Sequence, residues 1–389
     1  MTRRLAIEEI LDDPSKTKAF VESHQFPIVE AASDRPAAPA AEAQVVTFVW
    51  FGQADEVSLR HWVFGLEAST ALLRAPNSEL WYLTLEIPRA SRVEYKLEIR
   101  RGGKSDWIED PLNPNRARDP FGANSVLQTH GYEPPAWTRP DETARQGTLV
   151  KLALQTAAFG GVRTVPVYLP ARFRKSRQYP LLVVHDGSDY LNYASMKTVL
   201  DNLIHSLVIP DLVVAFTDSP DRLNEYASDE RHARFLSEEL LPALNENFPL
   251  LDKPQSRCLM GASFGAVAAF STAWRYPGKW GRLLLQSGSF AFTDIGKHNR
   301  RGPVFDKVVE FVNAYRANPQ PVSEKVFLSC GVYESLIYEN RSLLPLLQAT
   351  GMEVRLIESR DGHNWENWRD RLRDGLSWLF PGPLLFIYE

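Results

Sequence analysis

Two hydrophobic patterns divide the chain, and the change between them falls near residue 147. Between residues 44 and 132, apolar and polar residues alternate in short runs such as 80–87 and 93–99, with polar turns between them. Further short runs of this kind lie at 45–51, 57–60 and 125–127. Alternation is typical of strands with one buried face. We therefore predict a small all-β sandwich over residues 44–137.

After residue 147 the pattern changes to continuous apolar runs that alternate with amphipathic stretches. The predicted strands lie at residues 149–157, 163–169, 181–185, 212–216, 257–260, 283–286, 326–330 and 354–357. The predicted helices lie at residues 196–207, 229–247, 264–276, 304–317, 338–349 and 366–380. This order predicts a mostly parallel sheet covered by helices on both faces, so we expect one α/β domain over residues 147–389.

The first 43 residues differ from both regions. Residues 5–24 predict one or two short helices, and the Ala/Pro-rich stretch 31–43 is typical of a flexible connector. We expect residues 1–43 to form a helical segment and linker ahead of the β domain.

Composition and charge exclude several classes of protein. The 44 basic and 48 acidic residues give a net charge of −4, which does not indicate nucleic acid or an anionic membrane as partner. The N-terminus lacks the apolar core of a signal peptide, and no run is long enough to span a membrane. We expect the two cysteines, Cys258 and Cys330, to be reduced core residues, and the protein to be cytoplasmic.

A Gly-x-Ser-x-Gly pattern lies at residues 261–265, between a predicted strand and a predicted helix. The two glycines allow a sharp turn that exposes the hydroxyl of Ser263, and the N-terminus of the following helix favours negative charge beside it. This setting predicts that Ser263 is a nucleophile.

A serine nucleophile needs a base and a group that orients the base. Of eight histidines, His363 is preferred because it follows the last predicted strand, and His185 is the second choice. Glu334, just after the strand 326–330, is the predicted acid, with Glu339 as its competitor and Asp361 as a weaker candidate.

The oxyanion of the transition state needs two backbone donors. The N–H of Phe264 is the first, because it directly follows the nucleophile. We expect the second in the turn after the strand 181–185, from the amide of Ser188 or of Asp189.

The chain from residue 147 onward resembles the esterase D family of α/β-hydrolases, in particular its enterochelin (ferric enterobactin) esterase branch. The motifs that carry this resemblance are His185-Asp186-Gly187, Asp218 with 222–226, 238–242, 261–265, 286–289, 331–334 with Asn340-Arg341, and Gly362-His363-Asn364-Trp365. Residues 44–132 are similar to the immunoglobulin-like N-terminal domain of those esterases, through 110–114, 119–122 and 124–127.

The resemblance implies hydrolysis of a carboxylic ester through an acyl-enzyme, with a catecholate trilactone siderophore as substrate. An anionic ferric complex needs a basic pocket, to which we expect Arg222 to contribute; Arg300, Arg301 and Arg341 are further candidates. Tyr190 and Trp365 are the predicted aromatic contacts to substrate.

Two other functions fit the same sequence. One is a feruloyl or acetyl carbohydrate esterase with the same triad, and the other is a catalytically silent protein that binds a glycan or a partner. The sequence predicts neither a metal site nor a cofactor, since no histidine or cysteine cluster has ligand spacing and no Gly-rich phosphate loop is present. It leaves the oligomeric state open.

Overall fold

The computed structural model describes residues 4–31, 43–292 and 303–383. Two compact units make up the chain. The first comprises Met1–Glu133 with the short segments Val332–Ser335 and Ser359–Gly362, and the second comprises the remainder. The predicted connector 31–43 lies almost entirely outside the described residues, as do Arg300 and Arg301.

The first unit is a β sandwich with short helices at its start. Its elements are α1 (Glu8–Asp12), η1 (Pro14–Lys16), α2 (Thr17–Ser23), β1 (Ile28–Ala31), β2 (Ala43–Phe51), β3 (Glu56–His61), β4 (Ser69–Ala71), β5 (Leu73–Arg74), β6 (Leu80–Pro88), β7 (Arg92–Arg101), β8 (Lys104–Ile108), β9 (Arg116–Asp119) and β10 (Gly122–Gln128). One sheet has the order β1-β2-β6-β5 and the other β4-β3-β7-β10-β9, with β8 beside β7. Side chains of both sheets, such as Phe48 and Leu97, form one buried cluster. The all-β prediction is confirmed, and immunoglobulin-like topology stays a prediction.

The short helices expected in the N-terminal segment are present, and they pack on the sandwich. Ile10 and Phe20 share a buried cluster with Val49 and Leu80, and β1 pairs antiparallel with β2. The apolar side chains of the short helices are thereby removed from water, which these helices could not achieve alone.

The second unit is built on a sheet with the strand order β11-β12-β14-β13-β15-β16-β17-β18. The strands are β11 (Thr148–Gln155), β12 (Val162–Leu169), β13 (Leu181–His185), β14 (Val213–Thr217), β15 (Arg257–Ala262), β16 (Arg282–Gln286), β17 (Lys325–Gly331) and β18 (Glu353–Ser359). The first two pair antiparallel, whereas β14, β13, β15, β16 and β17 run parallel. All eight strands predicted after residue 147 are present.

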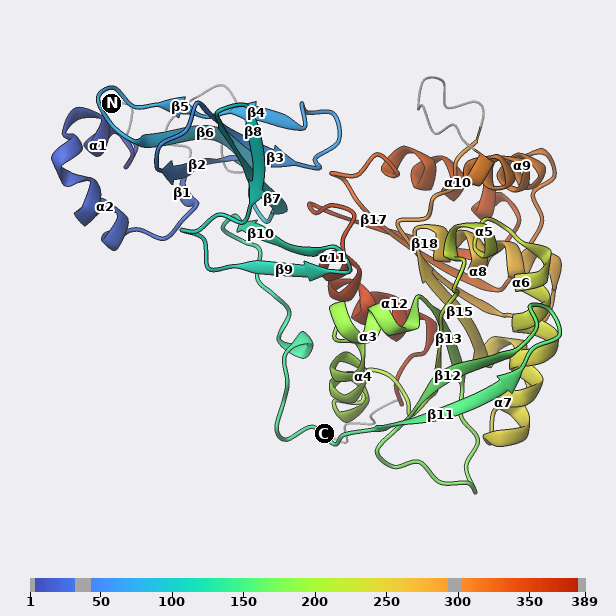
Figure 1. The fold of residues 1–389 in the computed structure, drawn as a ribbon. Coiled ribbons are helices and arrows are strands. Elements are labelled where there is room, and N and C mark those ends of the chain that lie inside the picture. The colour runs from blue at the N-terminus through green and yellow to red at the C-terminus, as the bar shows by residue number, and fades with distance from the viewer. Residues whose placement is uncertain (1–3, 32–42, 293–302, 384–389) are drawn as a thin grey trace. The chain divides into compact units, whose positions relative to one another are not determined.

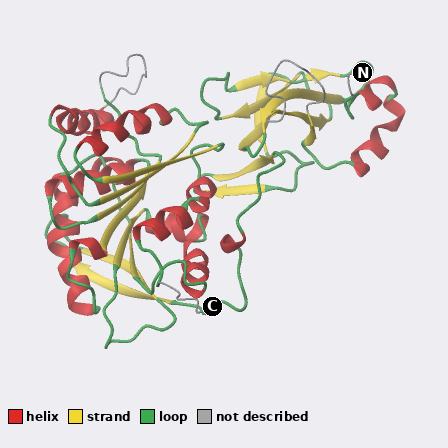
Figure 2. Ribbon diagram, turned by 180° about the vertical axis from the view of Figure 1, so that it is seen from behind, coloured by secondary structure: helices red, strands yellow, loops and turns green. Residues whose placement is uncertain are grey.

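Helices cover both faces of this sheet (Figures 1 and 2). They are η2 (Ala136–Thr138), α3 (Gly187–Tyr193), α4 (Met196–His205), α5 (Arg222–Glu225), α6 (Glu230–Arg234), the π-helical turn η3 (Phe235–Leu240), α7 (Leu241–Asn247), η4 (Pro254–Ser256), α8 (Phe264–Arg275), α9 (Pro303–Ala317), α10 (Ile337–Ala349), α11 (Trp365–Asp370) and α12 (Leu372–Leu379). In β13, Leu181 and Val183 face the core beneath α6–α10, and Leu182 and Val184 face the core beneath α3, α4, α11 and α12. Burial on both faces explains why the middle of a central strand such as β13 is continuously apolar.

Candidate active site

Ser263 stands in a strained turn between β15 and α8. Its backbone angles are φ 57° and ψ −119°, which a residue with a side chain rarely adopts. A Cβ on Gly261 would lie 2.4 Å from the carbonyl carbon and oxygen of Gly265, so only glycine fits there. The turn is therefore a local feature that residues 261–265 specify, as the sequence predicted.

Hydrogen bonds hold the strained serine from both sides. The N–H of Ser263 donates to the carbonyl of Gln286 at 2.9 Å. The carbonyl of Ser263 accepts a hydrogen bond from the N–H of Ser289 at 3.2 Å. Its Oγ lies 3.1 Å from the Oγ of Ser289 and the residue is partly exposed. Ser263 is thus fixed at the carboxyl end of β15 with its hydroxyl open to a reactant.

Positive φ recurs at three adjacent strand ends. Asp186 after β13, Ser263 after β15 and Ser287 after β16 have φ of 54°, 57° and 45°. Such conformations cost about 1–3 kcal/mol each and gather at functional sites. The carboxyl ends of three neighbouring strands therefore form the strained part of the sheet.

Backbone donors are available beside Ser263, but Ser188 is not one of them. The Ser188 N–H donates to Oδ1 of Asp218 at 3.0 Å, and the Asp186 N–H donates to the hydroxyl of Tyr226 at 3.2 Å. Among the described residues, the N–H groups of Phe264, Gly187 and Asp189 have no acceptor. The choice of Ser188 is corrected on this ground, since the carboxylate of Asp218 occupies its amide.

Gly187 and Asp189 are the two candidates in α3 for the second donor. The parallel pair of β13 and β15 ends with Val184 level with Met260, so strand register does not decide between them. A Cβ on Gly187 would lie 2.4 Å from the Cβ of Phe216 in β14, which explains the glycine at this position.

The loop of His363 connects to the strand end beside Ser263. His363 is exposed and lies between β18 and α11, and its ring meets the ring of Trp368 edge-on at 5.0 Å. The carbonyl of Trp368 accepts a hydrogen bond from the side chain of Gln286 at 2.8 Å. Gln286 in turn accepts the N–H of Ser263 through its own carbonyl.

The candidate acids fall in different parts of the chain. Glu334 belongs to the segment 332–335 of the first unit, and Glu339 lies in α10 of the second. Both are buried, with 4% and 2% of their surface exposed. The assignment of Glu334 stays a prediction.

The predicted aromatic contacts divide into one buried and one partly exposed residue. Tyr190 is fully buried and its hydroxyl donates to Oε1 of Gln286 at 2.7 Å, so it supports the site from below and does not offer a surface to substrate. Trp365 is partly exposed and packs edge-on against Tyr190 at 5.2 Å between ring centres. Trp365 remains the aromatic candidate for substrate contact.

The arginines expected near substrate are paired with carboxylates. Arg222 donates two hydrogen bonds of 2.7 Å to Asp186, and Arg341 donates two of 2.6 Å to Glu358. Burial, together with the charges of Asp186 and Asp218, raises the pKa of Asp189 to about 6. The turn after β13 thus has more carboxyl groups near it, those of Asp186, Asp189 and Asp218, than guanidinium groups, of which Arg222 supplies one.

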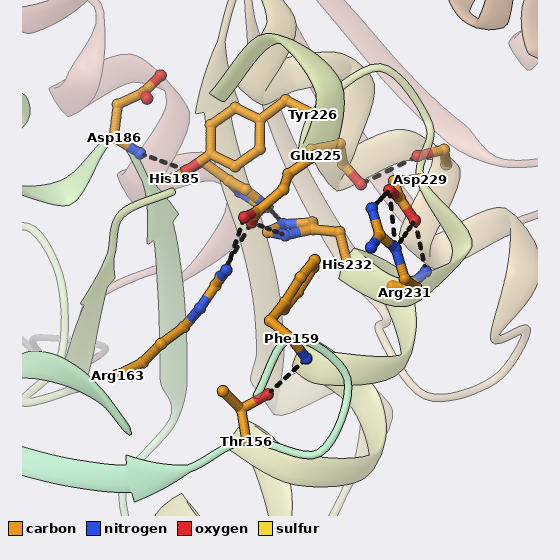
Figure 3. Close-up of polar contacts among 12 residues, drawn as sticks. Thr156, Phe159, Arg163, His185, Asp186, Glu225, Tyr226, Asp229, Arg231 and His232 are labelled. Carbon is orange, nitrogen blue, oxygen red and sulfur yellow. Dashed lines mark hydrogen bonds and ion pairs between the residues drawn. The ribbon is translucent and has the colours of Figure 1, made fainter. Parts of the chain in front are cut away.

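Sequence reasoning missed a buried histidine pair behind this turn. His185, weighed as the second choice of base, is fully buried and lies 3.1 Å from His232, nitrogen to nitrogen (Figure 3). Its position at the end of β13 was visible in the sequence. Its partner in α6 was not, because 47 residues separate the two.

The described residues contain neither a metal-binding cluster nor a membrane-spanning helix. No three His, Cys, Asp or Glu side chains come together there as a group that could hold a metal ion. None of the helices in that part of the chain has both the length and the apolar composition that crossing a bilayer requires.

Comparisons with known proteins identify the family and the fold of the chain. A family model described as putative esterase matches residues 156–379. The iron(III) enterobactin esterase of Dickeya dadantii is 25% identical over 351 residues, which cover 80% of this chain and 79% of that protein. The ferric enterobactin esterase structure from Salmonella typhimurium has a TM-score of 0.75 at 20% identity and covers 93% of this chain and 98% of its own. A ferulic acid esterase structure has a TM-score of 0.54 at 19% identity, over 61% of this chain and 98% of its own. The predicted fold, an α/β-hydrolase preceded by a smaller all-β domain, is confirmed.

Proposed function

Because the chain belongs to the putative esterase family and is a carboxylic ester hydrolase, we propose that it acts as a serine esterase with Ser263 as its nucleophile. The backbone of Ser263 carries this proposal. A non-glycine residue at φ 57°, two positions after a glycine that its contacts require and at the N-terminus of α8, is the arrangement in which a serine hydroxyl is presented for attack.

The proposed reaction has two stages. His363 takes the proton of the Ser263 hydroxyl as the oxygen attacks the ester carbonyl, and it then gives that proton to the departing alkoxide. Water, activated by the same imidazole, hydrolyses the acyl-enzyme. Glu334 orients the imidazole and stabilises its charged form, with Glu339 as the alternative acid.

Two backbone amides stabilise the oxyanion in this proposal. They belong to Phe264 and Gly187, whose N–H groups have no acceptor in the described part of the chain. Each such donor contributes about 3 kcal/mol to the transition state.

A catecholate trilactone of the enterobactin type is the proposed substrate. The support is the similarity to two enterobactin esterases, which extends over both units of the chain and not over the hydrolase alone. Trp365 offers a partly exposed ring for an aryl group, and Arg222 offers a guanidinium that Asp186 shares. Feruloyl esters are the second candidate, because a ferulic acid esterase matches the hydrolase fold.

A panel of esters tests the nucleophile and the substrate in turn. The purified protein is expected to hydrolyse p-nitrophenyl butyrate, and Ser263→Ala is expected to abolish the reaction. Iron-loaded and iron-free enterobactin are then compared with methyl ferulate, using mass spectrometry, since each opened ester adds one water to the product. Faster turnover of methyl ferulate than of either trilactone would replace the proposed substrate.

Two glutamine variants assign the acid. Glu334→Gln is expected to lower kcat on p-nitrophenyl butyrate by about 10²- to 10⁴-fold, because a neutral amide cannot stabilise the imidazolium. Glu339→Gln is the matched variant, with its carboxylate also buried. The reverse result would assign the role to Glu339.

A further inference from the structure

A chain of three buried polar side chains and the partly buried Arg163 runs behind the turn that follows β13 (Figure 3). His185 Nδ1 lies 2.8 Å from the carbonyl oxygen of Met260, and its Nε2 lies 3.1 Å from Nε2 of His232. His232 Nδ1 lies 3.6 Å from Oε2 of Glu225. Two hydrogen bonds of 2.6 and 2.9 Å then join Glu225 to Arg163. The chain thereby ties together β15, β13, α6, α5 and β12.

The contacts fix the position of each proton. A carbonyl oxygen only accepts, so Nδ1 of His185 carries the proton that bonds to Met260. Burial lowers the pKa of His185 to about 3, so its ring is neutral and Nε2 presents a lone pair. His232 must therefore donate from its own Nε2. The histidine at position 232 is needed as a donor, which an apolar residue could not replace.

The far end of the chain is an ion pair between Glu225 and Arg163. Burial opposes ionisation of Glu225, but the two hydrogen bonds from Arg163 help to bring the pKa of this carboxyl down to about 2. The guanidinium of Arg163 also lies over the ring of Phe159 at 4.0 Å. At 3.6 Å the contact between His232 and Glu225 is too long for a hydrogen bond, and Nδ1 of His232 makes none. The hydrogen-bond partner of His232 in this chain is therefore His185.

The near end of the chain abuts the proposed oxyanion donors. The ring of Tyr226 packs edge-on against both histidines, at 5.1 and 5.0 Å, and its hydroxyl accepts the N–H of Asp186, next to Gly187. A Cβ built on Gly265 would lie 3.2 Å from the Cβ of His185 and 3.3 Å from Oδ2 of Asp186. The turn after β13 and the start of α8 are therefore in contact. We expect a tilt of the His185 ring to displace the neighbouring backbone.

We propose that His232 is a positioning residue for ester hydrolysis. Its Nε2–H holds the His185 ring in the orientation in which Nδ1 bridges β13 to β15, and this bridge sets the separation between the amides of Gly187 and Phe264. The inference rests on the proposed function, because it requires that these two amides bind an oxyanion. His232 itself is fully buried and touches no substrate.

Two substitutions at one position test the proposal. His232→Leu removes the donor, and His232→Gln keeps an N–H that can reach His185. With p-nitrophenyl butyrate, His232→Leu is expected to lower kcat about 10- to 100-fold with KM little changed, since small displacements of donors affect the transition state most. His232→Gln is expected to restore kcat to within about threefold of the parent. Nitrogen-15 spectra of the histidines are expected to show the Nδ1–H tautomer of His185 in all three proteins, because the carbonyl of Met260 fixes it. The Nε2 resonance of His185 is expected to show loss of its hydrogen bond in His232→Leu but not in His232→Gln.

A matched control separates positioning from loss of stability. Asp201→Asn alters a buried polar group at the amino ends of the strands, where Asp201 bonds to Gly147 and Tyr168. It is expected to lower the melting temperature without lowering kcat. If His232→Leu retains kcat, or if His232→Gln loses as much kcat as His232→Leu, the positioning role is overturned while the esterase stands. If the parent neither hydrolyses the ester nor reacts with a fluorophosphonate at Ser263, the proposed function has failed and this inference fails with it.

Discussion

The two ends of the parallel strands in the second unit use buried polar groups differently. At the amino ends, Asp201 accepts the N–H of Gly147 at 2.7 Å and the hydroxyl of Tyr168 at 2.8 Å, and its other oxygen meets Lys197 at 2.6 Å. At the carboxyl ends, three residues have positive φ and Nδ1 of His232 makes no hydrogen bond.

The amino ends of the strands contribute to stability, whereas the carboxyl ends form the proposed site. The network around Asp201 gives each of its carboxylate oxygens a donor and stabilises the fold. The strained backbone and the unsatisfied Nδ1 of His232 at the carboxyl ends lower the stability of the fold, and packing in the rest of the unit offsets this loss. Such costs fall where the sheet presents Ser263, which is the end of an α/β sheet where ligands bind.

The largest expected effect separates two exposed histidines. His363→Ala is expected to lower kcat on p-nitrophenyl butyrate by about 10²- to 10⁴-fold, because it removes the proposed base at the carboxyl ends. His205→Ala, at the end of α4, is expected to leave kcat unchanged. Equal rates for the two variants would remove His363 from the mechanism.

A second prediction concerns the glycine that permits the strained turn. Gly261→Ala brings a Cβ within 2.4 Å of the backbone of Gly265, and the expected cost is about 3 kcal/mol or more in the free energy of unfolding. At Gly278, where φ is +78° but no atom lies within 4 Å, the same change is expected to cost about 1 kcal/mol. Urea unfolding measures both, and similar losses at the two sites would contradict the crowding that the structure describes.

At the amino ends, stability and activity are expected to separate. Asp201→Asn weakens the bonds to Gly147, Tyr168 and Lys197, and the expected loss is about 2 kcal/mol of unfolding free energy with kcat unchanged. Chemical denaturation and ester hydrolysis on one preparation measure the two quantities. A fall in kcat comparable to that of His232→Leu would erase the distinction between the two ends.

The smallest expected effect is a pH dependence of stability at the carboxyl ends. The pKa of Asp189 is raised from an ordinary value of 3.8 to about 6, so the folded protein holds this proton more tightly than the unfolded chain. Stability is therefore expected to fall as pH rises from about 4 to about 6. Asp189→Asn removes this fall, so its melting temperature should gain on the parent over that range and stay level above it. A difference that is constant with pH would show that Asp189 does not titrate there.

The sequence predicted the parts of this architecture that depend on local patterns. The central strands were visible because residues such as Leu182 and Val183 are buried on opposite faces, which makes the middle of each strand continuously apolar. The turn at Ser263 was visible because the Gly-x-Ser-x-Gly pattern is local, and Gly261 is required by its contact with Gly265 four residues later. Helices α3 and α5 were missed, because short helices at strand ends carry no repeating apolar face.

The parts that depend on distant residues could not be predicted in the same way. The Ser188 amide is engaged because Asp218 arrives from the next strand end, and Tyr190 is buried because Gln286 accepts its hydroxyl. The pair of His185 and His232 joins residues 47 positions apart. Each depends on tertiary packing that no spacing in the sequence reports.

Reaction with a fluorophosphonate, followed by peptide mass mapping, tests the central claim most directly. We expect a single adduct on Ser263, formed at a rate that falls sharply in His363→Ala and not in Asp201→Asn. An adduct on another serine, such as Ser289, whose Oγ lies 3.1 Å away, would contradict the assignment of the nucleophile, as would labelling of Ser263 that His363→Ala leaves unchanged.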